Sequence, residues 1–268
     1  MSLAICSLAS GSSGNCYMVR SQGTALLVDA GISARRIRNG LARLDVDPAM
    51  LEGVLVTHEH SDHISGLRTL TRSGNLKIYA NDQTFRGMGL SLPEERCCRF
   101  STGDSFQVGE LEVRTFAVSH DTADPVGYSL GFGGQRITIV TDTGTVTRAL
   151  IDEIRDADIL VLESNHDENI LRMGSYPWFL KQRILGERGH LSNEAAARAL
   201  ASVLQDEMRQ GRKKPRRVLL AHLSRENNFP EMAVATMENI LEESGCPAGS
   251  HTQLITLSRT EISPVYSV

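Results

Sequence analysis

The sequence predicts a mixed α/β protein in which short buried strands alternate with helices. Short apolar runs bounded by Gly, Ser and Asn recur along the chain, and they are typical of strands. Between them, residues such as Ile37, Leu41 and Leu44 are apolar at helical spacing. Because no internal repeat, long linker or low-complexity tract interrupts this alternation, we expect one domain over residues 1–268.

The expected strands come early and then alternate with helices. By residue number the expected strands are 3–8, 16–20, 25–28, 54–56, 77–80, 110–118, 126–132, 136–141, 159–162 and 218–221. The expected helices are 33–44, 193–209 and 231–241. The helix from Asn193 is the clearest, because it is rich in Ala and Leu, follows Ser192 as an N-cap and has Glu194 in its first turn.

The composition is that of an ordinary globular protein. Hydrophobic residues make up 41% and charged residues 22%, which excludes disordered and collagen-like classes. No apolar run approaches the roughly 20 residues of a membrane-spanning helix, and five cysteines without a CxxC pair suit a reducing compartment. We therefore expect a cytoplasmic protein without a membrane segment. The net charge of −4 argues against nucleic-acid binding by bulk charge alone.

One hexapeptide carries the strongest chemical signal in the sequence. His58-Glu59-His60-Ser61-Asp62-His63 follows directly on a buried strand. His58 and His60 are two residues apart on extended chain, so both rings can face one side, and Asp62 and His63 can reach a neighbouring position after a turn. Imidazole and carboxylate groups suit zinc, manganese and iron, so the hexapeptide predicts a metal site.

Other candidate ligands follow strands further along the chain. His120, Asp142 and His222 each come at the end of an apolar run. A single histidine in such a place is more often a hydrogen-bonded structural residue. Three strand-end candidates in a chain that already carries the hexapeptide favour metal binding instead.

Together these residues resemble the pattern of the metallo-β-lactamase superfamily, and the resemblance covers nearly the whole chain. It implies a four-layer αββα sandwich with two divalent metal ions, zinc or manganese, at the strand ends. The ligands it implies are His58, His60 and His120 for one ion and Asp62, His63 and His222 for the other. Asp142 would bridge the ions, and Asp29 would be the acid that orients the metal-binding loop.

Two further residues resemble the branch of tRNA 3′-processing endonucleases within that superfamily. His190, in Gly189-His190-Leu191-Ser192, matches a histidine near the scissile phosphate, and Glu163 matches the glutamate that holds it. The segments around Ser10, Glu163, His190 and His222 together are similar to the YycJ/WalJ-like family. That resemblance implies a 5′-to-3′ exonuclease on double-stranded DNA, linked to repair.

The implied mechanism is phosphodiester hydrolysis at a dinuclear centre. A metal-bridging hydroxide attacks phosphorus, with Asp62 beside it to take a proton, while His190 donates a proton to the leaving oxygen. We assign Ser12, Ser13, Asn15, His166 and Asn193 to substrate binding. Gly11 and Gly14 let the loop from Ser10 to Asn15 turn its N–H groups toward one anion, although a tight turn between strands explains them equally well.

The sequence is compatible with several alternatives. The run Arg212-Lys213-Lys214-Pro215-Arg216-Arg217 can contact a nucleic-acid backbone, but it is more typical of a solvated loop. DNA is favoured over RNA because no long inserted arm for gripping tRNA is found. A hydrolase of small or cyclic phosphodiesters, a thioesterase or an inactive binding module is the alternative, and the oligomeric state is not predicted.

Overall fold

The computed structural model describes residues 2–72, 74–212, 214–249 and 252–268, and the chain folds into two compact units. The first unit contains Met1–Ala117, Thr122–Gln135 and Ser258–Val268. The second contains Val118–Asp121 and Arg136–Leu257. One domain over residues 1–268 stays a prediction. No helix among the described residues is long and apolar enough to cross a membrane.

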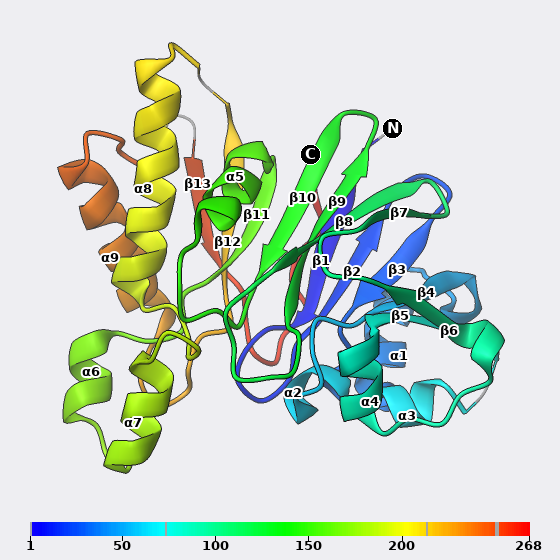
Figure 1. Ribbon diagram of the computed structural model, residues 1–268. Helices are drawn as coiled ribbons and strands as arrows, with labels where there is room; N and C mark the ends of the chain where they lie inside the picture. Colours follow the sequence, from blue (N-terminus) through cyan, green and yellow to red (C-terminus); the bar gives the residue numbers. More distant parts are fainter. Residues whose placement is uncertain (1, 73, 213, 250–251) are drawn as a thin grey trace. The chain divides into compact units, whose positions relative to one another are not determined.

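A mixed sheet forms the framework of the first unit, with seven strands in the order β14-β1-β2-β3-β4-β5-β6 (Figure 1). Its strands are β1 (Ala4–Ala9), β2 (Cys16–Arg20), β3 (Ala25–Val28), β4 (Leu51–Leu55), β5 (Lys77–Asn81), β6 (Cys97–Phe100) and β14 (Tyr266–Ser267). Pairing is antiparallel from β14 to β3 and parallel from β3 to β6. Because β3 and β4 are parallel neighbours, the residues that follow them emerge at one edge of the sheet.

The first unit also contains helices, and several of them bury apolar residues in a core shared with this sheet. They are α1 (Ala34–Arg43), η1 (Pro48–Met50), α2 (Ser61–Ile64), α3 (Leu67–Leu70), α4 (Asp82–Met88) and η2 (Glu94–Arg96). Ile37 and Leu41 of α1 are fully buried in the same core cluster as Leu8, Val54 and Ile78. The unit also contains an antiparallel ladder of β7 (Ser105–Val108), β8 (Leu111–Ala117) and β9 (Val126–Phe132).

Parallel strands form the framework of the second unit. They are β10 (Gln135–Val140), β11 (Ile159–Glu163), β12 (Arg216–Ala221) and β13 (Thr252–Thr256), paired in that order. The central β11 reads Ile-Leu-Val-Leu-Glu and is buried throughout, as expected for a parallel strand covered on both faces. The carboxyl ends of β10, β11 and β12 therefore lie at one edge, where Asp142, Glu163 and His222 follow or end the strands.

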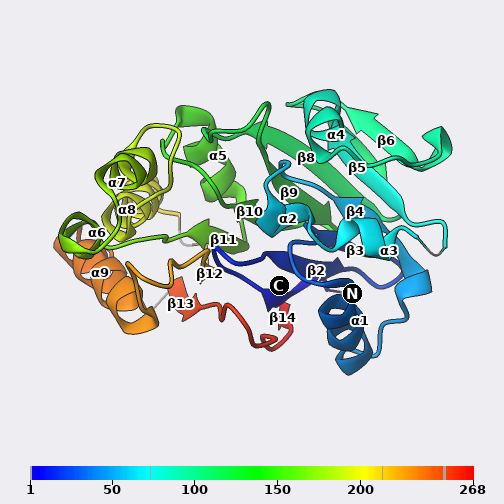
Figure 2. The ribbon, with the colours of Figure 1, turned by 90° about the horizontal axis from the view of Figure 1, so that it is seen from below.

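Helices α5 (Arg148–Asp156), α8 (Asn193–Arg209) and α9 (Pro230–Glu243) pack beside these parallel strands (Figure 2). Ser192 caps α8 as predicted, since its side chain accepts a hydrogen bond from the Ala195 N–H at 3.1 Å. Two shorter helices, α6 (Glu168–Met173) and α7 (Trp178–Leu185), are inserted between β11 and α8. The insertion begins just after Glu163 and ends just before His190.

Candidate metal centre

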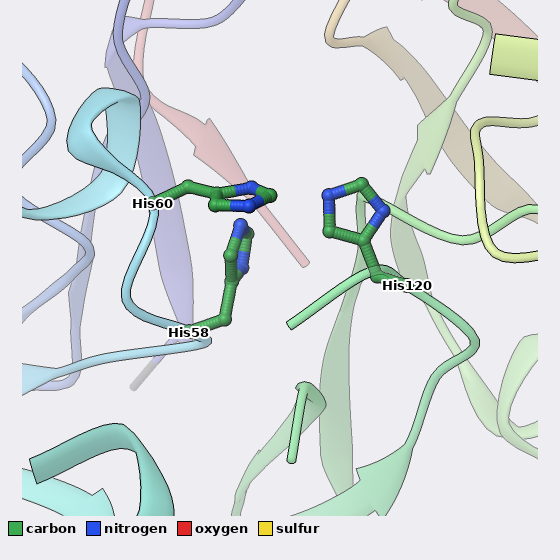
Figure 3. Close-up of side chains that lie close together, drawn as sticks. All are labelled: His58, His60 and His120. Carbon is green, nitrogen blue, oxygen red and sulfur yellow. The ribbon is translucent and has the colours of Figure 1, made fainter. Parts of the chain in front are cut away.

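The loop after β4 and the short helix α2 carry the predicted hexapeptide. The rings of His58 and His60 lie 4.9 Å apart, edge to face, and those of His58 and His63 lie 4.1 Å apart. Figure 3 shows the first pair side by side, and the third labelled residue, His120, belongs to the second unit. His58 and His63 are buried, whereas 23% of the Asp62 side chain is exposed. The first unit thus gathers three imidazoles and one carboxylate.

Asp29 supports this histidine cluster from the end of β3. It follows that strand in the left-handed conformation, with φ 59°, which is uncommon for a residue other than glycine. Its carboxylate accepts hydrogen bonds from His63 Nδ1 at 2.7 Å and from the Thr57 N–H at 2.9 Å. The Thr57 hydroxyl lies 3.0 Å from both Asp29 Oδ2 and His58 Nδ1. Burial raises the pKa of Asp29, and the facing His63 opposes that rise.

The glycine-rich loop before β2 packs tightly against the hexapeptide. The Asn15 side chain contacts His63 Nε2 at 3.1 Å and accepts from the Gly11 N–H at 2.9 Å. Gly31 is required beside it, because a Cβ at that position would lie 1.5 Å from the Asp62 carbonyl oxygen. Ser12 and Ser13 are exposed at the tip of the loop, whereas Asn15 is fully buried. Asn15 therefore contacts a predicted ligand directly.

Glu163 is the centre of the polar cluster in the second unit. Its Oε1 accepts from His190 Nδ1 at 2.8 Å and from His222 Nδ1 at 2.9 Å. Its Oε2 accepts from the N–H groups of Thr143 at 3.0 Å and Leu191 at 3.1 Å. Burial raises the pKa of this carboxyl, but the charge of His190 and the hydrogen bonds outweigh burial and hold it at about 2. Glu163 is therefore ionised.

Asp142 lies between two predicted histidine ligands of the same unit. Its Oδ1 is 3.7 Å from His120 Nε2 and 3.6 Å from His222 Nε2. Two atoms each about 2.1 Å from one tetrahedral ion are separated by about 3.4 Å, so each of these two spacings suits a pair of ligands that share an ion better than it suits a hydrogen bond. Asp142 and His222 both adopt the left-handed conformation, with φ 58° and 56°. Such residues concentrate at functional sites.

The remaining nitrogens of these histidines are fixed by the protein. His120 Nδ1 lies 3.0 Å from the carbonyl oxygen of Gly189, and His222 Nδ1 is bound to Glu163. A histidine ligand ordinarily donates its second N–H to a carbonyl or carboxylate while the other nitrogen binds the metal. Burial lowers the pKa of His120, partly opposed by Asp142, which favours the neutral ring that a metal needs. The donor set therefore fits a divalent metal ion.

His166 and Asn193 lie in a buried network of amides beside this cluster. Asn193 is fully buried, and its amide exchanges hydrogen bonds with Asn228 at 3.1 and 2.9 Å and accepts from Ser164 at 2.6 Å. His166 Nδ1 lies 3.3 Å from Asn165 Oδ1, whereas no described residue hydrogen-bonds its Nε2. Burial lowers the pKa of His166 to about 4. The His166 ring is thus neutral at physiological pH.

The basic run near the start of β12 is largely engaged within the second unit. Arg216 is 3% exposed and pairs with Glu207, while Lys214 Nζ lies 3.1 Å from Asp158 Oδ1. Lys213 lies outside the described residues. The hypothesis that this whole run contacts a nucleic-acid backbone is therefore wrong for Arg216, because a buried guanidinium already bound to a carboxylate is not available to phosphate.

Sequence reasoning did not find three residues that support these clusters. Thr57 was passed over although it directly precedes His58. Asn228 lies in the segment from His222 that resembles the YycJ/WalJ-like family, but no role was assigned to it because its partners are distant in sequence. The stem of Arg259 packs on Gly11, which leaves no room for a Cβ there, and its Nη1 is buried without a hydrogen-bond partner among the described residues. Arg259 reaches the glycine-rich loop from the opposite end of the chain.

Histidine and carboxylate side chains at the ends of parallel strands, several of them held by a buried acid or carbonyl, are typical of a metal-dependent hydrolase. Residues 24–223 match the Beta-lactamase superfamily domain, and the chain belongs to the metallo-β-lactamase superfamily. This match implies divalent metal ions, for which each unit supplies suitable donors.

Relatives of known name support the same assignment. The chain is 41% identical over 252 residues to the exodeoxyribonuclease YycJ of Bacillus anthracis, covering 93% of each chain. It is 36% identical over 266 residues to the exodeoxyribonuclease WalJ of Streptococcus pneumoniae, covering 97% of this chain and 96% of that one. The crystal structure of the metallo-β-lactamase fold protein YhfI from Bacillus subtilis matches with a TM-score of 0.72 at 15% identity, covering both chains completely. The predicted family and fold class are confirmed.

Proposed function

We propose that the protein is a dinuclear metal-dependent phosphodiesterase that degrades double-stranded DNA from the 5′ end. The observation that carries the proposal is the hydrogen bond between Glu163 and His190, a pair suited to protonating the oxygen of a departing sugar. The names of the relatives YycJ and WalJ, both exodeoxyribonucleases, support DNA as the substrate. DNA over RNA, the direction of cleavage and a role in repair are parts of this proposal.

The proposed metal ligands are those that the family resemblance implies. His58, His60 and His120 would hold one ion, Asp62, His63 and His222 the other, and Asp142 both. When bound, two divalent ions, zinc or manganese, supply an activated bridging water and stabilise the charge that develops on the phosphoryl group. Asp62 is suited to accept a proton there because part of its side chain is exposed.

His190 is proposed as the general acid. Its side chain is 19% exposed, whereas Glu163 is fully buried. Because Glu163 is ionised and accepts from Nδ1, it orients the ring so that Nε2 is the atom left to deliver a proton. The same carboxylate fixes the ring plane, so that His190 can return to the same position after each turnover.

We propose two different roles for the residues assigned to substrate binding. The exposed Ser12 and Ser13 offer hydroxyl groups at the tip of the glycine-rich loop, and Nε2 of His166 is buried without a hydrogen-bond partner among the described residues. Asn15 and Asn193 are fully buried, and their amides are bound to protein groups. For these two we propose that they hold the substrate-binding loops in place.

The test is cleavage of end-labelled substrates. Duplex DNA, single-stranded DNA and RNA of one sequence, each labelled at the 5′ end, are incubated with the protein and added manganese or zinc. We expect early release of labelled mononucleotide from the duplex and little cleavage of RNA. Hydrolysis of a small phosphodiester without cleavage of any polymer would refute the nuclease and favour a small-molecule phosphodiesterase.

A cytoplasmic location also remains part of the proposal, consistent with five free cysteines.

A further inference from the structure

The inserted helices α6 and α7 present an unusual group of aromatic residues to solvent. Trp178 is 65% exposed and Phe179 is 72% exposed, and Met173 at the end of α6 is 82% exposed. Tyr176 lies between them in sequence and is partly exposed. Single exposed apolar residues are ordinary, but several large ones within seven residues form a patch of the kind that binds a partner. We call Met173, Tyr176, Trp178 and Phe179 the aromatic tip.

The turn that carries the aromatic tip is held by specific contacts. Lys181 is 9% exposed, and its Nζ donates to the carbonyl oxygens of Arg172 at 2.8 Å and Gly174 at 2.6 Å. The Gly174 N–H donates to the Ile170 carbonyl at 2.7 Å. A buried ammonium group that binds the last carbonyls of α6 fixes the start of α7. The turn between α6 and α7 therefore holds Trp178 and Phe179 in exposed positions.

Helix α7 carries Trp178 and Phe179 at its start, and its other end contacts the proposed general acid, His190. The His190 N–H donates to the Ile184 carbonyl of α7 at 3.0 Å, and Arg183 of α7 pairs with Asp121 of the same unit. An eight-residue helix is about 12 Å long, so α7 places the tip roughly three to four stacked nucleotides from the residues that hold His190. Figure 1 shows α6 and α7 next to each other beyond the ends of β11 and β12.

The charge of the insertion favours an anionic partner. Residues 164–189 contain four basic residues and three acidic ones, which gives +1, whereas the whole chain carries −4. Arg172 is 54% exposed beside the tip, and its guanidinium pairs with Glu168 at 3.1 Å. Aromatic side chains interleaved with positive charge are typical of surfaces that bind single nucleic-acid strands, where bases stack on the rings. A purely apolar partner would gain nothing from this local charge.

We propose that Trp178 and Phe179 form a stacking surface for nucleobases of the DNA strand that is cleaved beside His190. This inference rests on the proposed nuclease function and adds a binding surface to it. The rings would hold bases a few nucleotides from the scissile phosphate, while phosphate contacts and the metal centre position the backbone. Because stacking is tolerant of sequence, the surface would support degradation without base preference.

The first test uses the fluorescence of Trp178, which is the single tryptophan in the sequence. The metal-loaded protein is titrated with a phosphorothioate-linked DNA that resists cleavage, and with a matched oligonucleotide that has abasic sites in place of its bases. We expect quenching by the first, and at least tenfold weaker binding of the second, because its backbone charge is kept and its bases are missing. Equal quenching, or none, by the two would overturn the stacking surface.

The second test uses variants with a matched control. Trp178→Leu and Phe179→Leu keep an apolar side chain but lose the ring, so KM for DNA should rise about tenfold, whereas Trp178→Phe should restore most of the loss. Met50→Leu is the control, because Met50 is 72% exposed in the first unit and outside the aromatic tip. Unchanged KM in both leucine variants would refute the inference. The inference would also be refuted if light scattering showed a parent dimer that becomes a monomer in these variants without any change in DNA affinity. The aromatic tip would then be a subunit interface.

Failure of this inference differs from failure of the proposed function. If the parent protein degrades DNA but Trp178 is not quenched, the stacking surface is wrong and the nuclease stands. If Trp178 is quenched by base-containing DNA but no polymer is cleaved with either metal, the nuclease is wrong and the surface binds DNA for another purpose.

Discussion

A single oxygen atom, Oε1 of Glu163, accepts hydrogen bonds from both His190 and His222, at 2.8 and 2.9 Å. His222 is a proposed metal ligand and His190 is the proposed general acid, so one buried carboxylate would support both proposed roles. The two rings lie 5.2 Å apart between centroids. Glu163 is the last residue of the central strand β11, which is buried throughout.

Replacement of His190 tests the role of general acid. Protonation of a poor leaving group typically contributes 10²–10⁴-fold, and a leaving group that is stable as an anion does not need it. His190→Ala should therefore slow hydrolysis of DNA by about 10²–10⁴-fold, but that of bis-p-nitrophenyl phosphate far less. Steady-state rates on both substrates, with metal content measured alongside, check this. Equal loss on the two substrates at full metal occupancy would assign His190 to positioning the phosphate.

Replacement of Glu163 should affect acid catalysis and metal binding together. Glu163→Gln removes the charge that both histidines face, and loss of such a partner typically costs 10–100-fold in metal affinity or activity. We therefore expect weaker metal binding than in His190→Ala, as well as slower DNA cleavage. Competition with a chelator measures the first effect. If metal affinity stays at the parental value while DNA cleavage slows, the bond to His222 has no functional role.

Asp142 should be more important for metal content than any ligand of a single ion. Its carboxylate lies near His120 and His222, and we propose that it bridges two ions. Asp142→Ala should abolish activity and lower the bound metal below the level found in His120→Ala. Elemental analysis of both purified variants, compared with the parent, provides the measurement. Two equivalents of metal in Asp142→Ala would exclude the bridging role.

Asp29 should act on the histidine loop without contacting substrate. Asp29→Asn keeps the shape of the side chain but removes the charge that faces His63 Nδ1 at 2.7 Å. Metal affinity is expected to fall 10–100-fold, and excess metal should restore much of the turnover. A variant that stays inactive at saturating metal, with normal metal content, would mean that Asp29 has a role beyond orienting His63.

The local pattern of apolar residues in the sequence predicted several strands and helices correctly. The bounds of β2, β3, β9 and α8 agree with the prediction, since apolar runs bounded by turn residues decide the strands and helical spacing with the Ser192 cap decides the helix. Short elements such as α6, α7 and β14 were missed because so few residues carry little periodic signal and long-range contacts stabilise them. The hexapeptide and the strand-end residues were readable as metal ligands from residue type. The contacts of Thr57 and Arg259 were not, because they depend on three-dimensional packing.

The buried His166 should make the protein less stable in acid. The folded-state pKa of about 4 lies below the ordinary value of 6.5, so between these values the unfolded chain binds a proton that the folded chain does not. The contribution is therefore fully present above pH 6.5, declines as the pH falls toward 4 and then levels off. A difference of this size corresponds to about 3 kcal/mol in the free energy of unfolding.

His166→Gln should flatten that decline, whatever it does to stability at pH 8. Urea unfolding of the chelator-treated parent and variant, measured from pH 8 to pH 4, gives the two slopes. Metal is removed so that the other histidines titrate in the same way in both proteins. Their contributions to the unfolding free energy then cancel in the comparison. The difference in unfolding free energy between the two proteins should change in favour of the variant by about 3 kcal/mol between pH 7 and pH 4. Parallel curves would show that His166 is protonated as easily in the folded chain as in the unfolded one.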